Sequence, residues 1–185
     1  MDKIAAFSKL KNDMKILTIV LIVALVAIQS CVQLREGVEV DYDEFDEKTT
    51  IVGIEQDSWE HSEDVIQYQG NPSKHFIRTF VKPDIVSHQL YIVAYYRGDW
   101  RFYRRAEAKA DDELDDFVQI NRDVVDGCSY GCIYREDWAI SISDNFLQHN
   151  KEGFKIKSYA KSGHEHVIKV TAEQIKAQLE ALKEL

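Results

Sequence analysis

Runs of β-forming residues separated by turn signals recur along most of the chain, and they constrain the fold more than any other feature of the sequence. Several of them alternate apolar and polar residues, as strands with one buried face do. The runs lie at 38–42, 50–54, 74–81, 90–97, 100–106, 117–125, 133–143, 154–160 and 166–170. Because most of the connections between them are short, we expect an antiparallel sheet.

The end of the chain carries the strongest helical signal. Thr171 and Gln174 have the T-x-x-Q spacing of a capping box. Ile175, Leu179 and Leu182 then follow at helical spacing and form one apolar stripe. The predicted fold class is therefore α+β: an antiparallel β-sheet with several hairpins, and a C-terminal amphipathic helix packed on it.

The clearest hairpin signal covers residues 90–106, LYIVAYYRGDWRFYRRA. Gly98-Asp99 predicts a two-residue turn with glycine first, between two long β-forming runs. In that register Tyr95 pairs with Phe102 and Tyr96 pairs with Arg101. Arginines would then lie beside aromatic rings, which favours cation–π contacts.

This hairpin is also a candidate binding site for a glycan, a lipid headgroup or a partner protein, because aromatic and arginine side chains dominate interface energies. The candidate residues are Tyr96, Trp100, Arg101, Tyr103 and Arg105. The favoured alternative is that these side chains simply form part of the core and a solvated sheet edge.

The N-terminal segment has a different character. Residues 16–28 form an apolar run of 13 residues. A spanning helix needs about 20 apolar residues, so the run is short for a permanent span and suits the core of a signal peptide. Four lysines precede it, as expected for a segment whose start stays in the cytoplasm. Cys31 follows the run almost at once.

The stretch Ile28-Gln29-Ser30-Cys31 resembles the lipobox of bacterial lipoproteins, in which an apolar residue at −3 and small residues precede the lipidated cysteine. The resemblance implies cleavage before Cys31, a diacylglyceryl group on its thiol, and a location in the bacterial envelope. By resemblance to enteric lipoproteins, Val32 in place of an aspartate after the cysteine implies the periplasmic face of the outer membrane. The implied division is a signal peptide at 1–30, a lipidated cysteine and tether at 31–37, and a single α+β domain at 38–185. A signal anchor and ordinary secretion are the alternatives.

Two further cysteines stand close together. Cys128 and Cys132 are separated by three residues, and Gly131 lets the backbone bend between them. In an exported chain this spacing predicts a structural disulfide. A redox pair and a metal site are alternatives, although the spacing is not C-x-x-C and a metal site needs two more ligands. His164 and His166 are expected to be surface histidines beside a turn.

Charge and motifs limit the function classes. The chain has a net charge of −9. Residues 1–30 hold four lysines and two aspartates, a net +2, so the rest carries −11. An acidic body repels phosphate backbones, so no nucleic-acid partner is expected. The sequence contains no G-x-S-x-G, H-E-x-x-H or P-loop motif, and no catalytic residue, metal or cofactor is expected.

These observations predict a non-enzymatic envelope lipoprotein, anchored to the membrane by lipid on Cys31, whose domain binds or scaffolds an envelope component. The tract CSYGCIYREDWAISIS at 128–143 resembles small envelope proteins of Gram-negative bacteria, which implies no activity. One alternative is an exported thiol-redox protein or enzyme that uses Cys128 and Cys132. The other is a glycan- or lipid-binding module that uses the hairpin around Tyr96 and Arg105.

Overall fold

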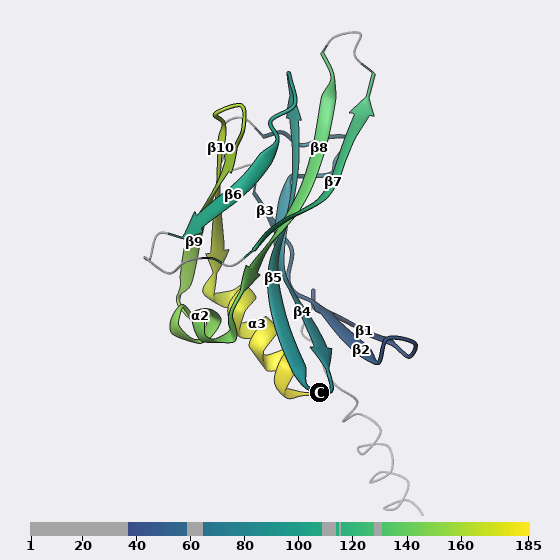
Figure 1. Cartoon of the computed structure of the whole chain (residues 1–185), viewed down its shortest axis with the longest axis vertical. Helices are drawn as coiled ribbons and strands as arrows, with labels where there is room; N and C mark the ends of the chain where they lie inside the picture. Colours follow the sequence, from purple (N-terminus) through teal and green to yellow (C-terminus); the bar gives the residue numbers. More distant parts are fainter. Residues whose placement is uncertain (1–36, 59–64, 109–113, 115, 128–130) are drawn as a thin grey trace, which may run out of the picture. The chain divides into compact units, whose positions relative to one another are not determined.

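A computed structural model of the chain describes residues 37–58, 65–108, 114, 116–127 and 131–185, all within one compact unit. Most of these residues lie in strands (Figure 1). The strands are β1 (Glu39–Asp43), β2 (Lys48–Val52), β3 (Gln56–Asp57), β4 (Lys74–Lys82), β5 (Ile85–Arg97), β6 (Tyr103–Ala108), β7 (Phe117–Asp126), β8 (Ile133–Ile142), β9 (Gly153–Ala160) and β10 (Glu165–Thr171). The helices are α2 (Asp144–His149) and α3 (Ala172–Lys183).

The strands form two antiparallel sheets. The seven-stranded sheet has the order β1-β2-β4-β5-β8-β7, with β3 also paired to β4. The three-stranded sheet has the order β10-β9-β6. The predicted fold class is confirmed: the chain is an α+β protein built mainly of antiparallel sheet, with the C-terminal helix packed on it.

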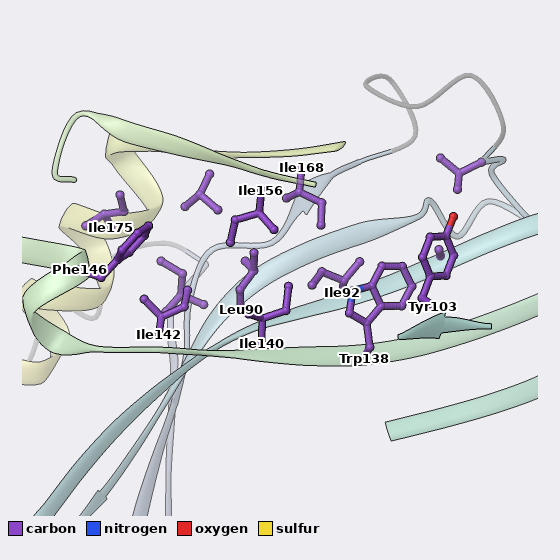
Figure 2. Close-up of a cluster of buried hydrophobic side chains, with 14 of the residues drawn as sticks. Leu90, Ile92, Tyr103, Trp138, Ile140, Ile142, Phe146, Ile156, Ile168 and Ile175 are labelled. Atoms are coloured by element: carbon purple, nitrogen blue, oxygen red, sulfur yellow. The ribbon is translucent and has the colours of Figure 1, made fainter. Parts of the chain in front are cut away.

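The main core lies between one face of the large sheet and the small sheet together with α3 (Figure 2). Trp138 of β8 is its largest fully buried side chain. The indole stacks on the ring of Tyr103 at 4.3 Å between centroids, and its N–H donates to Ser158 Oγ at 3.1 Å. Because the buried indole is hydrogen-bonded, its polar edge costs little and its ring area stabilises the contact between the sheets.

Helix α3 begins as the sequence predicts and adds polar contacts to the predicted apolar stripe. Both hydrogen bonds of the Thr171–Gln174 capping box are present. Ile175 and Leu179 are buried. The helix also buries Gln178, whose amide donates to the Ile51 carbonyl at 3.2 Å and to a threonine hydroxyl of β4 at 2.7 Å. These bonds fix the position of α3 along the strands in a way that apolar contacts alone do not.

The predicted hairpin at 90–106 is wrong in its pairing. β5 pairs with β4 and β8, whereas β6 pairs with β9 in the other sheet. Tyr95 therefore lies opposite Arg135, and Tyr96 lies opposite Tyr134. The chain turns away after Arg97 and crosses from the large sheet to the small one, with Phe102 at a positive φ of 58°.

Buried Glu136 gives the physical reason for this crossing. Its carboxylate, at the centre of β8, accepts the backbone N–H of Phe102 at 2.9 Å and that of Tyr103 at 3.3 Å. It also accepts the hydroxyl of Tyr96 and Arg122 Nε, the latter at 2.9 Å. A buried carboxylate needs several donors, and here the chain supplies two of them by leaving the hairpin path.

Candidate binding surface

The structure places most of the sequence-predicted binding residues in the core. Tyr96 and Tyr103 are fully buried, and Arg101 is 3% exposed. The guanidinium of Arg101 lies 4.3 Å from the centroid of the Tyr96 ring, so the expected cation–π contact forms between buried groups. These three side chains therefore stabilise the crossing between the sheets and do not present a surface to a ligand.

The other two candidates lie on different parts of the molecule. Trp100 is half-buried and packs against Tyr134, with 4.5 Å between ring centroids. Arg105 is exposed on the small sheet, where its guanidinium lies 3.9 Å from the Tyr159 ring centroid and pairs with Glu107. The five predicted binding residues do not form one surface.

The cysteine predictions fall largely outside the described residues. Cys31, the apolar run at 16–28 and Cys128 all lie there. Cys132 is half-buried and packs against the main core. The disulfide between Cys128 and Cys132 stays a prediction. No helix among the described residues has the length and apolar content needed to cross a membrane.

The two neighbouring histidines separate in the fold. His164 is exposed in the turn between β9 and β10, as expected, and its Nδ1 lies 2.9 Å from Ser162 Oγ. His166 is instead fully buried, edge-on to the rings of Tyr103 and Trp138, so the surface prediction is wrong for it. Within the described part of the chain, no three His, Cys, Asp or Glu side chains gather in a way that could hold a metal ion.

A different set of aromatic and arginine side chains gathers on the large sheet, on the face opposite the main core. Side chains alternate along a strand. Ile77 of β4 and Leu90 of β5 point into the main core, so the residues on either side of each of them point to the opposite face. The cross-strand pairs Phe76–Tyr91 and Tyr95–Arg135 lie on this face. We name it the aromatic–arginine face and define it by Phe76, Arg78, Phe80, Tyr91, Tyr95 and Arg135.

Arg78 is the centre of this face. Its guanidinium lies 4.8 Å from the Phe80 ring centroid and 4.6 Å from that of Tyr91. One terminal nitrogen donates to Gln89 Oε1 at 2.7 Å, and the buried Nε has no hydrogen-bond partner. Partial burial lowers the pKa of Arg78, yet a guanidinium remains charged at neutral pH.

No ion pair among the described residues includes Arg78. The other arginine of the face differs in this respect. Arg135 binds Asp137 with two nitrogens, at 2.7 and 2.6 Å. Tyr91 donates to the same carboxylate at 3.1 Å, and burial together with Asp137 raises the pKa of Tyr91 to about 12. The face thus holds one arginine neutralised by Asp137 and one, Arg78, that has no acidic partner within the part of the chain that the structure describes.

The sequence carried a signal for this face. Phe76, Arg78 and Phe80 are spaced two apart in the predicted strand at 74–81, so any strand there must place them on one side. The two-residue spacing does not show which side of the strand is buried. The predicted hairpin at 90–106 contains consecutive aromatic residues, and for that reason the binding site predicted from the sequence lies there, at Tyr96 and Tyr103. Only the position of α3 on the opposite face shows that the Phe76 side faces away from the core.

The structure defines the architecture of the protein: it is a two-sheet α+β domain that carries the aromatic–arginine face. Comparisons with models of known protein families, with curated proteins and with solved structures find no match for the chain. The chemistry of the site therefore rests on its own residues.

Proposed function

We propose that the chain is an exported, lipid-anchored envelope protein whose domain binds another envelope protein through the aromatic–arginine face. The lipobox-like stretch ending at Cys31 supports the anchor and the location. The observation that carries the binding role is Arg78: a guanidinium stacked on two rings, half-buried and without an acidic partner among the described residues. An acidic side chain of a partner would complete it with charge-assisted hydrogen bonds.

A protein partner suits this face better than a glycan. Sugar rings stack on free aromatic faces, whereas here Arg78 lies over the rings of Phe80 and Tyr91, and Phe76 stacks on Tyr91 at 5.0 Å. Aromatic residues and arginine are enriched at protein interfaces, and pre-stacked side chains lose little conformational freedom on binding. The domain acts as a scaffold that holds an acidic partner near the membrane.

Site-specific photo-crosslinking in living cells tests the binding role. The photoreactive residue replaces Thr50, which lies opposite Phe80, or Val118, which lies opposite Ala139; both are on the aromatic–arginine face. The control position is Lys161, which is exposed in the turn between β9 and β10. We expect an adduct of discrete mass with one envelope protein from the first two positions and not from Lys161.

The variant Arg78→Gln distinguishes specific binding through this face from nonspecific adsorption. The adduct should weaken at least tenfold in Arg78→Gln, because the acidic contact is lost, and persist in Arg104→Gln, an exposed arginine of β6. An adduct that survives Arg78→Gln, or none with any envelope protein, contradicts the proposal. Binding of purified envelope polysaccharide that is lost in Arg78→Gln would replace the protein partner with a glycan.

The anchor has its own test. Intact mass of the protein from membranes should correspond to a chain that begins at Cys31 and carries a lipid-sized addition. Cys31→Ala should remove the addition. A chain that still begins at Met1 in the wild type would show a signal anchor or a cytosolic protein. That result would favour a redox pair or a metal site over a structural disulfide at Cys128 and Cys132.

A further inference from the structure

The small sheet carries a strongly charged surface on the side that faces away from the main core. Ile156, Ser158 and Ile168 are buried on the core side, so the residues between them on β9 and β10 point outward. The same alternation holds on β6, which pairs with β9. We name this surface the small-sheet outer face and define it by its charged residues, Arg105, Glu107, Lys155, Lys157, Glu165 and Lys169.

The small-sheet outer face is positive, whereas the rest of the chain from residue 31 onward is acidic. Its four cations and two carboxylates give a net charge of +2. Because residues 31–185 carry −11, the remainder of them carries −13. The two carboxylates are already paired within the face. Glu107 binds Arg105, and Glu165 binds Lys157 at 2.8 Å.

The excess positive charge comes from Lys155 and Lys169. These two lysines are direct cross-strand partners, and both are exposed. Like charges directly opposite each other destabilise a strand pair. Within the part of the chain that the structure describes, neither lysine forms an ion pair. Departures of this kind from local pairing rules are expected at functional sites.

The shape of this face suits an extended anionic surface better than a small ligand. A hollow of 260 Å³ lies on it, between Lys155, Tyr159 and Val167. Small-molecule sites usually have volumes of about 300–1,000 Å³. Lysine is depleted at protein interfaces, whereas clusters of lysine and arginine are attracted to membranes that contain anionic lipids.

The small-sheet outer face and the aromatic–arginine face lie on opposite sides of the domain. The main core joins the two sheets, and each of these faces is the side of its sheet that points away from that core. Packed sheets lie about 10 Å apart, and exposed charges are screened over about 8 Å at physiological ionic strength. An anionic surface against the small sheet is therefore screened from acidic groups on the far side.

We propose that the small-sheet outer face rests on a bilayer surface that contains anionic lipids, with Lys155 and Lys169 against the lipid phosphates. This orientation turns the aromatic–arginine face away from the bilayer, toward its protein partner. The inference rests on the proposed function only in that the chain is held at a membrane, and it does not require binding at Arg78. Because an anchored domain stays close to the bilayer, a weak attraction is enough to orient it.

Lysine acetylation followed by mass spectrometry tests this contact. The full-length chain, purified from membranes, is reconstituted in vesicles of phosphatidylcholine, either alone or mixed with phosphatidylglycerol. We expect Lys155, Lys157 and Lys169 to react about fivefold more slowly, or slower still, on the mixed vesicles. Lys82 of β4 and Lys183 of α3 should react equally on both. Equal reaction of the three small-sheet lysines on both kinds of vesicle overturns the proposal.

A double variant tests whether the two unneutralised lysines orient the domain. In Lys155→Gln with Lys169→Gln, the protection of Lys157 by the anionic vesicles should be lost. The matched control is Lys82→Gln with Lys183→Gln, which removes the same charge from other elements and should keep the protection. Because neither lysine of the first variant forms an ion pair among the described residues, its melting temperature should be retained. Protection of Lys157 that persists in this variant overturns the proposal.

The outcome can be separated from that of the proposed function. Intact mass of the same preparation reports the lipid on Cys31, and the crosslinks from Thr50 and Val118 report the protein partner. A lipidated chain without protection of its small-sheet lysines therefore overturns the membrane contact alone. Protection in native membranes that is absent on anionic vesicles would show that an acidic protein covers this face, and it would also overturn the membrane contact.

Discussion

Replacing Glu136 by glutamine should destabilise the domain by about 2–4 kcal/mol. Each carboxylate oxygen accepts two donors: one binds Tyr96 and the N–H of Phe102, the other binds the N–H of Tyr103 and Arg122. A glutamine amide nitrogen cannot accept, so two donors lose their acceptor in either orientation. A buried donor without a partner costs about 1–3 kcal/mol. Arg122 is one-third exposed and can turn to water, which limits the total.

Urea unfolding followed by tryptophan fluorescence measures this loss, since Trp138 is buried beside the crossing. Tyr96→Phe should cost less than Glu136→Gln, because the carboxylate keeps three donors and only one buried donor, the N–H of Arg101, loses its acceptor. Burial and the bond to Glu136 raise the pKa of Tyr96, so its hydroxyl keeps the proton that it donates. Arg104→Gln, on an exposed side chain, should change stability by less than about 0.5 kcal/mol. A loss below about 1 kcal/mol in Glu136→Gln would refute the reasoning.

Three further changes have expected outcomes. Burial lowers the pKa of His88 below 6.5, although Asp144 lies 3.6 Å away. The stability that neutral His88 contributes is therefore complete above pH 6.5 and is lost as the pH falls. The free energy of unfolding of His88→Gln should depend less on pH between 7 and 5 than that of the wild type, and an equal pH dependence in the two proteins would count against this. Gly53→Ala places a Cβ 2.9 Å from the Ile77 carbonyl, which should cost about 1–3 kcal/mol in urea unfolding, and a neutral result would contradict it. Thr171→Ala removes the cap of α3 and should lower stability by about 1 kcal/mol, whereas Thr171→Ser should restore most of it.

Local patterns predicted the elements well where the forces that form them are local. The strand at 74–81 matches β4, the run at 117–125 matches β7, and the runs at 154–160 and 166–170 pair as β9 and β10. The helix at the end follows its capping box because the cap is satisfied within four residues. Alternation and capping depend on neighbours in sequence, so the sequence contains enough to place them.

The candidate sites depended on contacts that no local pattern contains. Tyr96 and Tyr103 looked like one surface because Gly98-Asp99 is a good hairpin turn. Glu136, more than 30 residues later, binds the Tyr96 hydroxyl and the backbone N–H of Tyr103 beyond that turn, and both rings are buried in the core. In the sequence, Arg78 is one residue of an ordinary strand. Only the tertiary structure places Tyr91 of the neighbouring strand beside it.

By itself the sequence determined the fold class, most strand positions and the final helix, together with a lipobox-like stretch that predicts an anchor at Cys31. The tertiary structure decided how the strands pair and which face of the large sheet is buried. The physical reason is that periodicity and capping are satisfied within a few residues. The choice of a strand partner is settled by buried charges and side-chain packing between distant parts of the chain.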